Sequence, residues 1–189
     1  TLADTNIEVI DNNGGKLEDG YGNRKSIMHY KFGIFDVADS ENAYLITSSA
    51  NWTEKDFEIN PNNILLIQDQ NLARAYFEEF NEMWSGKFNR NKDLKKHKGE
   101  LFKIDGRTVE LWMSPSEDPF MSFQMRYLNI FSEAKKSLYF APFNFTLNRL
   151  AEEIEKKFAE GLDVRGIGND GSWDINGSVF FNMRGVKHF

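Results

Sequence analysis

The residues best suited to chemistry lie in one short apolar run, residues 28–36, which reads Met-His-Tyr-Lys-Phe-Gly-Ile-Phe-Asp. Side chains alternate between the two faces of an extended strand, so we expect His29 and Lys31 on one face and Tyr30 on the other. Burying an imidazole beside an ammonium is costly unless both groups are used. A phosphate would use both, with the imidazole as nucleophile or base and the ammonium as a fixed charge on the phosphoryl oxygens. Strict alternation puts Asp36 on the opposite face from His29, so we expect it to have an orienting or structural role.

A His-x-Lys pair by itself is far more typical of a half-buried strand histidine beside a lysine that reaches water. The residues that follow favour the functional interpretation. His-x-Lys-x4-Asp over residues 29–36, and then Tyr-Leu-Ile-Thr-Ser-Ser-Ala-Asn-Trp-Thr over residues 44–53, resemble the signature of the phospholipase D superfamily, in which a strand and Gly-Ser-x-Asn follow the first motif. The resemblance continues through residues 60–67 and 73–84. It implies an α/β fold, the phospholipase D-like layered fold, with a mixed β-sheet flanked by helices.

The resemblance assigns a role to each matching residue. It implies that His29 forms a phosphohistidine intermediate, or acts as the acid if a partner histidine attacks first. Lys31 would neutralise the non-bridging phosphoryl oxygens, and Asn51 would donate to the same oxygens. The hydroxyl of Ser49 would lie close by, while Ser48 stands where the family usually has glycine.

Two further points concern the groups around the motif. Asn62 stands at a position where the family often carries a carboxylate that accepts a hydrogen bond from the catalytic imidazole, and Glu58 is the nearest acid that could substitute for it. The scheme requires no metal and no cofactor, because histidine and lysine supply the nucleophile and the positive charge. The presence of only three histidines and no cysteine also argues against a multi-histidine or thiolate metal site.

Composition bears on the substrate and on the broad class of protein. The 189 residues carry a net charge of -6, whereas proteins that hold long nucleic acids usually present a basic face. This balance favours a phospholipid-type substrate over nucleic acid, although a local basic patch could still serve a nuclease. The sequence has no apolar run of membrane-spanning length and no visible signal peptide, so we expect a soluble domain, with its compartment left open.

Hydrophobic periodicity predicts alternating strands and helices. The run 95–98, Lys-Lys-His-Lys, could meet a phosphate or an anionic membrane surface, but a solvated charge run is the favoured interpretation. Residues 51–60 read as a polar loop, and Gly161 as a helix C-cap. The predicted strands are residues 6–10, 27–36, 43–48, 64–67, 108–113, 137–143 and 162–167, and the predicted helices are 70–84, 120–134 and 147–160.

The order of these elements looks rotated relative to the family, which commonly carries two repeats in one chain. Residues 1–88 resemble the C-terminal half of a first repeat with its HxKxxxxD motif, and residues 108–189 resemble the N-terminal half of a second repeat without its HxK motif. Residues 89–107 are expected to be the linker between them. This order favours a fragment of a longer two-repeat protein over a permuted single-motif protein.

The family chemistry needs two facing histidines, so catalysis by the isolated chain is in question. The Lys187-His188 order does not match the motif, so we assign no role to His188. A missing second repeat or a symmetric homodimer could supply the second histidine. Three hypotheses stay open: a phospholipid phosphodiesterase or phosphatidyltransferase with peripheral membrane contact, a nuclease of the same superfamily, and a catalytically incomplete phosphate-binding fragment or scaffold.

Overall fold

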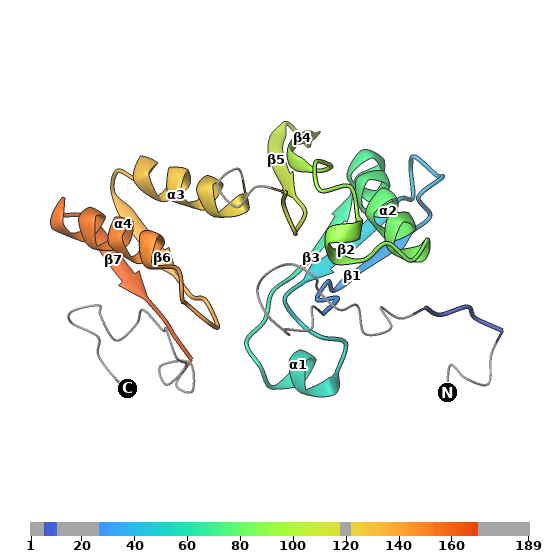
Figure 1. Ribbon diagram of the computed structural model, residues 1–189, viewed down its shortest axis with the longest axis horizontal. Helices are drawn as coiled ribbons and strands as arrows, with labels where there is room; N and C mark the ends of the chain where they lie inside the picture. Colours follow the sequence, from blue (N-terminus) through green and yellow to red (C-terminus); the bar gives the residue numbers. More distant parts are fainter. Residues whose placement is uncertain (1–5, 11–26, 118–121, 170–189) are drawn as a thin grey trace. The chain divides into compact units, whose positions relative to one another are not determined.

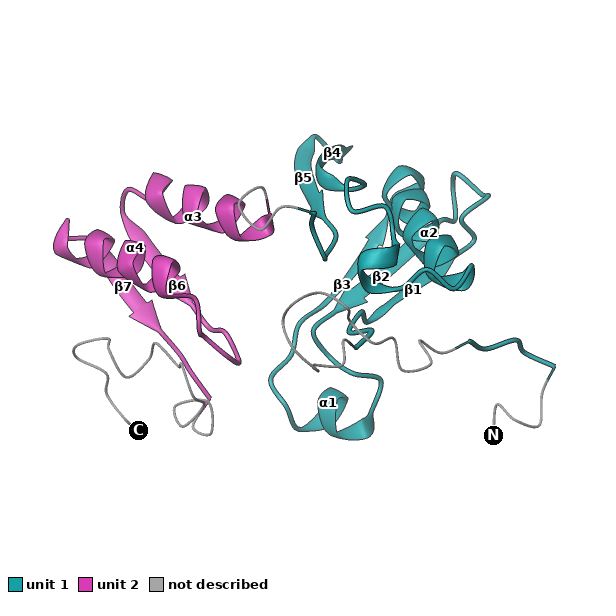
Figure 2. Ribbon diagram, viewed as in Figure 1, with its two compact units in different colours: residues 1–117 teal, residues 118–189 magenta. Residues whose placement is uncertain are grey.

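The computed structural model describes residues 6–10, 27–117 and 122–169, and these fall into two compact units. Unit 1 comprises residues 1–117 and unit 2 comprises residues 118–189 (Figure 2).

The centre of unit 1 is a three-stranded antiparallel sheet in the order β1-β2-β3 (Figure 1). Its strands are β1 (Phe32–Phe35), β2 (Tyr44–Ser48) and β3 (Ile64–Gln68), all rich in the β-branched and aromatic residues that strands favour. The turn after β1 begins at Asp36, whose φ of 49° is left-handed and whose carbonyl accepts from the Asp39 amide at 2.8 Å. Asp36 therefore shapes this turn.

Helix α2 (Gln70–Trp84) follows β3 and packs against β1 and β2. It begins where the Asp69 side chain accepts a hydrogen bond from the Leu72 amide at 2.8 Å, which satisfies one of the free N–H groups of the first turn. Its apolar residues recur at helical spacing, so Leu72, Ala75 and Met83 are buried. A short helix, α1 (Glu54–Glu58), lies in the loop that joins β2 to β3 (Figure 1).

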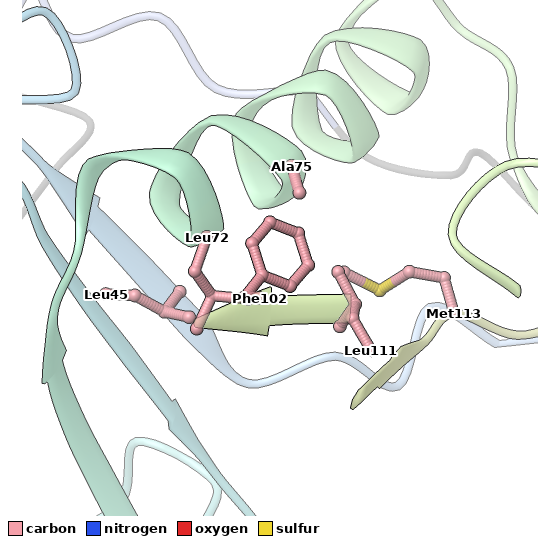
Figure 3. Packing of buried hydrophobic residues seen from close by; sticks show 6 residues of the cluster. All are labelled: Leu45, Leu72, Ala75, Phe102, Leu111 and Met113. Carbon is pink, nitrogen blue, oxygen red and sulfur yellow. The ribbon is translucent and has the colours of Figure 1, made fainter. Parts of the chain in front are cut away.

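A second layer of unit 1 is the hairpin of β4 (Lys98–Ile104) and β5 (Arg107–Trp112), which follows the 3-10 helix η2 (Asn89–Asn91). The Phe102 ring lies beneath α2, with Leu45 on one side and Leu111 on the other (Figure 3). The buried cluster comprises Leu45, Leu72, Ala75, Phe102, Leu111 and Met113. The hairpin therefore belongs to the same core as the sheet and α2.

Unit 2 contains α3 (Phe123–Glu133), β6 (Ser137–Phe140), α4 (Asn148–Ala159) and β7 (Asp163–Gly166). Strands β6 and β7 pair in parallel, and α4 is the crossover between them, as parallel pairing requires. Helix α4 ends before Gly161, whose φ of 90° confirms the predicted C-cap. The core of this unit is formed by Leu138, Phe145, Ala151 and Ile154.

The structure confirms the α/β class, with parallel and antiparallel pairing and with helices flanking the sheets. It corrects several predicted elements. Residues 6–10 form no strand, β1 starts at residue 32 and not at 27, β6 ends at Phe140, and the loop over 51–60 contains α1. None of the described helices is long and apolar enough to cross a bilayer.

The division between the units differs from the expected one. Residues 89–107, expected to be a linker, contain η2 and β4, and the boundary falls at residue 117. The assignment of the two parts to halves of two repeats stays a prediction. His188, to which the sequence assigns no role, lies outside the described residues.

Candidate active site

His29 and Lys31 lie just before β1, where the chain is already extended along β2. The Ser48 amide donates to the Lys31 carbonyl at 3.0 Å, so the pairing of β1 with β2 continues to Lys31. The Lys31 ammonium turns back and donates to the His29 carbonyl at 2.8 Å. His29 is exposed and Lys31 is partly exposed, so both side chains are accessible to a ligand. The pairing also sets the start of the loop after β2 beside this segment.

The pKa of Lys31 is held below its ordinary value, chiefly by desolvation of the ammonium. The negative charge of Asp56 opposes this effect and raises the pKa. Asp56 lies on α1, so its carboxylate acts electrostatically on the motif lysine although the two are 25 positions apart in the sequence.

The loop between β2 and β3 is organised around the Asp56 carboxylate. Asn51 donates to Oδ2 of Asp56 through its backbone N–H at 2.9 Å and through its side-chain amide at 2.5 Å. Asn60 donates to Oδ1 at 2.5 Å. These hydrogen bonds lower the pKa of Asp56, with the Asn60 bond the largest cause and the Asn51 bonds next. The carboxylate therefore stays ionised and fixes Asn51.

Ser49 and Asn62 close the base of the same loop. The Ser49 hydroxyl donates to the side-chain oxygen of Asn62 at 2.9 Å and accepts from the Asn63 amide at 3.0 Å. The side-chain amide of Asn62 donates to the Asp56 carbonyl at 3.0 Å. The structure thus joins three predicted site residues, Ser49, Asn51 and Asn62, through Asp56 and the loop backbone.

Sequence reasoning missed Asp56 and named Glu58 as the nearest acid that could substitute for a family carboxylate. Glu58 is exposed on α1, and it is Asp56 that receives the asparagine amides. A signal was available: Thr53-x-x-Asp56 resembles a capping box, and the Thr53 hydroxyl does accept from the Asp56 amide at 3.2 Å. That pattern predicts a helix start at this point of the loop.

Asp36, which the sequence predicts to have an orienting or structural role, is not part of this cluster. It follows the last residue of β1, whereas Lys31 precedes the first, so five residue steps, or about 16 Å of extended chain, separate them. Its exposed position in the turn fits the structural role expected from strand alternation.

Tyr30 is hydrogen-bonded through its hydroxyl to other parts of unit 1 and anchors the motif segment. Its hydroxyl donates to the Ser114 carbonyl at 2.6 Å, and the Lys92 ammonium donates to the Tyr30 hydroxyl at 3.3 Å. Lys92 also forms an ion pair with Glu79 on α2, and their side chains are only 5% and 3% exposed. Burial, and then the Glu79 charge, raise the pKa of the Tyr30 phenol, so it stays protonated.

A hollow of about 480 Å³ opens beside His29. Its wall combines the segment before β1 with the turn after α2 and the chain after β5, and all of these belong to unit 1. The residues that line it include Ile27, Met28, His29, Met83, Phe88, Arg90, Lys92 and Pro115.

The charge run over residues 95–98 is not a uniformly solvated face, contrary to expectation. His97 is buried and its Nδ1 lies 2.6 Å from Oε2 of Glu100. Lys98 is half-buried and its ammonium donates to the carbonyls of Met113 and Pro115, the latter at 2.9 Å. This segment therefore connects the start of β4 to the end of β5 and has a structural role.

Metal ligands do not gather in the part of the chain that the structure describes. No group of three or more His, Cys, Asp or Glu side chains there could hold a metal ion.

The similarity to known proteins lies in the part of the chain that contains His29, Lys31 and Asn51. Residues 3–84 match the family model described as "Cardiolipin synthase, PLD-like domain". The mitochondrial cardiolipin hydrolases of Canis lupus familiaris and Homo sapiens are each 39% identical over 57 residues, which is 30% of this chain and 20% and 21% of those proteins. The Danio rerio protein of the same name is 29% identical over 76 residues, or 40% of this chain and 31% of that protein. The aligned stretches thus span about a fifth to a third of these relatives' length, and no solved structure matches the chain significantly.

Proposed function

We propose that this chain, whose residues 3–84 belong to the phospholipase D superfamily, contributes one His-x-Lys motif to an active site that cleaves or transfers phosphodiester bonds, with a phospholipid as the substrate. The observation that carries the proposal is the placement of His29 and Lys31. Both side chains reach solvent at the start of β1, the Lys31 ammonium lies at the His29 carbonyl, and the loop that holds Asn51 begins beside them.

In the proposed reaction the His29 imidazole attacks phosphorus, and a P–N bond forms as the P–O bond to the leaving alcohol breaks. Lys31 stabilises the charge that builds on the non-bridging oxygens. A second histidine gives its proton to the alcohol, then takes one from the water or acceptor alcohol that displaces His29. Loss of one such charge-stabilising donor costs on the order of 3 kcal/mol of transition-state stabilisation.

Asn51 can donate to the substrate although its side-chain amide already donates to Asp56. One of its amide protons is held by Asp56, and a side-chain amide has two, so the other can be donated to a phosphoryl oxygen. We infer that Asp56 orients Asn51, with Ser49 and Asn62 holding the base of the loop.

The second histidine would come from a second motif in a longer protein or from His29 of a second copy of this chain. The net charge of -6 favours a lipid over a long nucleic acid, and the relatives named for cardiolipin hydrolysis support the same choice.

The test uses bis-p-nitrophenyl phosphate, because p-nitrophenolate leaves as an anion and needs no proton from a second histidine. We expect a His29-dependent burst of p-nitrophenolate in EDTA and an acid-labile phosphorylated protein. His29→Asn abolishes both and Lys31→Met slows the burst, whereas His188→Asn and Lys87→Met do not. A burst that persists in His29→Asn would overturn the proposal.

Parallel assays then separate the substrate classes. Cardiolipin-containing vesicles and single-stranded DNA are offered to the protein with its second histidine supplied by the longer chain or by a second copy. Cleavage of the lipid supports the proposal, cleavage of DNA alone supports the nuclease alternative, and binding without cleavage of either supports a phosphate-binding scaffold.

A further inference from the structure

We propose that the hollow beside His29 is a subsite for one ester arm of a phospholipid, the part of the substrate that carries the carbon skeleton away from the reacting phosphorus. This inference rests on the proposed function and adds to it where the lipid lies and which residues hold it.

The position of the hollow links it to the motif. Met28, His29 and Tyr30 are consecutive and all three line it. A phosphodiester whose phosphorus lies at His29 before the reaction has two ester arms, and an adjoining hollow of about 480 Å³ falls within the range of ligand pockets, about 300–1,000 Å³. A group that enters this space while phosphorus lies at His29 must therefore be one of the arms.

The wall suits a flexible apolar chain. Ile27 and Met28 are 67% and 48% exposed, so their apolar side chains are accessible to a ligand in the hollow. Phe88 and Pro115 are half-buried on the same wall, and Met83 is buried beneath it. Methionine adapts its shape to irregular apolar partners, so two methionines in one wall favour an acyl or glycerol arm.

The cations of the wall argue against a nucleic-acid strand. They are Arg90, which is exposed, and Lys92, which is buried and paired with Glu79. Single-strand binding relies on a basic groove that follows the backbone and on several aromatic platforms for bases. This wall offers Arg90 for a single anionic or polar group, and Phe88 and Tyr30 are its aromatic residues, the latter with its hydroxyl already bonded to Ser114.

The floor of the hollow is fixed by the buried network of Tyr30, Lys92 and Glu79. Lys92 donates to the Ser114 carbonyl at 3.1 Å and to the Tyr30 hydroxyl at 3.3 Å, so the motif segment, the turn after η2 and the chain after β5 are joined at one point. A preformed floor reduces the ordering cost of binding.

Methionine methyl groups provide a direct probe. The protein is labelled with ¹³C at its methionine methyls and titrated with a short-chain phosphatidylglycerol below its critical micelle concentration. We expect the Met28 and Met83 methyl resonances to shift together with the His29 ring, while Met125 in unit 2 stays unchanged. Dimethyl phosphate, which has no long arm, should shift only the His29 ring.

Variants test the wall. Phe88→Ala and Arg90→Gln should each weaken binding of the lipid about five- to tenfold, with little effect on dimethyl phosphate. Phe77→Ala on α2 and Arg107→Gln at the hairpin turn are matched controls and should bind normally. If Phe88→Ala lowers the melting temperature, Phe88→Leu replaces it and should restore most of the affinity.

Each other result overturns the subsite. If the lipid shifts the His29 ring and leaves Met28 and Met83 unchanged, the arm lies elsewhere and the proposed function stands. If a single-stranded oligonucleotide shifts the two methyls at lower concentration than the lipid, the hollow is a nucleic-acid site. If neither the His29 ring nor the methyls respond to any phosphodiester, the subsite and the proposed function both fail.

Discussion

Asn51 donates twice to one carboxylate oxygen, Oδ2 of Asp56, once from its backbone at 2.9 Å and once from its side-chain amide at 2.5 Å. This pair fixes both the start of the loop after β2 and the direction of the asparagine side chain. The same carboxylate raises the pKa of Lys31 against the effect of desolvation. Asp56, which is not a motif residue, thus acts on both Asn51 and Lys31.

Substitution of Asp56 should expose its contribution through pH. Hydrogen bonds lower the pKa of the folded carboxylate below its unfolded value of about 4, so its contribution to stability is present above that value and is lost as pH falls through the folded pKa. We expect Asp56→Asn to lower the melting temperature at pH 7. The difference from the unsubstituted protein should shrink as the pH is taken to 3.

The control for this experiment is Glu58→Gln, which removes a carboxylate two residues further along the same helix. It should change the melting temperature little at either pH. A gap between Asp56→Asn and the unsubstituted protein that stays constant down to pH 3 would contradict the role of the ionised carboxylate.

Asp56→Asn should also make Lys31 less basic. Desolvation already lowers the pKa of Lys31, and removal of the nearby negative charge takes away the effect that opposes it. Titration of the ¹³C-labelled lysine Cε resonances measures this directly. We expect the Lys31 resonance to titrate at lower pH in Asp56→Asn than in Glu58→Gln. Equal titration in the two variants would show that the Asp56 charge does not reach Lys31.

The sequence predicted the parts of the fold that depend on local pattern. The period of apolar residues predicted α2 over residues 70–84 with both bounds correct, because Asp69 caps its start and a continuous apolar face runs to Met83. Strand β2 and the succession of β6, α4 and β7 were predicted for the same reason, whereas the parallel pairing of β6 with β7 was not predicted. Apolar periodicity indicates which residues of a segment face a hydrophobic core, and that is why it predicted these helices and strands.

The sequence predictions that were wrong concern features that depend on tertiary contacts. Residues 6–10 alternate like a strand but pair with no described strand, and residues 89–107 are polar enough to read as a linker. Phe102 makes that segment part of the core, because one buried ring fixes the hairpin against α2. Asp56 was missed because its importance comes from amides at positions 51 and 60, which only the folded loop brings to it. The expectation that Tyr30 and His29 lie on opposite faces of an extended strand stays a prediction.

Tyr30 should stabilise the motif segment in a pH-dependent way. Burial and the Glu79 charge raise the pKa of its phenol in the folded state, so its contribution is fully present below the unfolded value of about 10 and is lost as pH rises through the folded pKa. Tyr30→Phe removes the hydrogen bond to Ser114 and should cost about 1 kcal/mol at pH 7. Denaturant unfolding at pH 7 and above pH 10 should show this cost shrinking at the higher pH. Tyr127→Phe on the exposed side of α3 controls for the loss of one phenol, and a cost that grows with pH would contradict this account.

Removal of one partner of the Glu79–Lys92 ion pair should lower the free energy of unfolding strongly, whereas replacement of both partners should lower it little. Lys92→Met leaves a buried carboxylate without its partner and should reduce the free energy of unfolding by about 3–5 kcal/mol. Adding Glu79→Leu removes the unpaired charge and should recover most of that loss, because the Ser114 carbonyl still accepts from Tyr30. Denaturant unfolding of the single and double variants gives the coupling energy. Additive losses would mean that the two charges do not depend on each other.

Adjacent residues of β4 offer a sharp test of the hairpin's place in the unit 1 core. Phe102 is 8% exposed and packs under α2, whereas Leu101, the neighbouring residue, points to the other face and is 64% exposed. Phe102→Ala should lower the free energy of unfolding by about 3–5 kcal/mol, because it removes a buried ring and leaves a cavity. Leu101→Ala should change it by less than about 0.5 kcal/mol, as exposed substitutions usually do. Equal small effects would mean that residues 89–107 behave as the linker that their composition suggests, and that the sheet and α2 hold together without the hairpin.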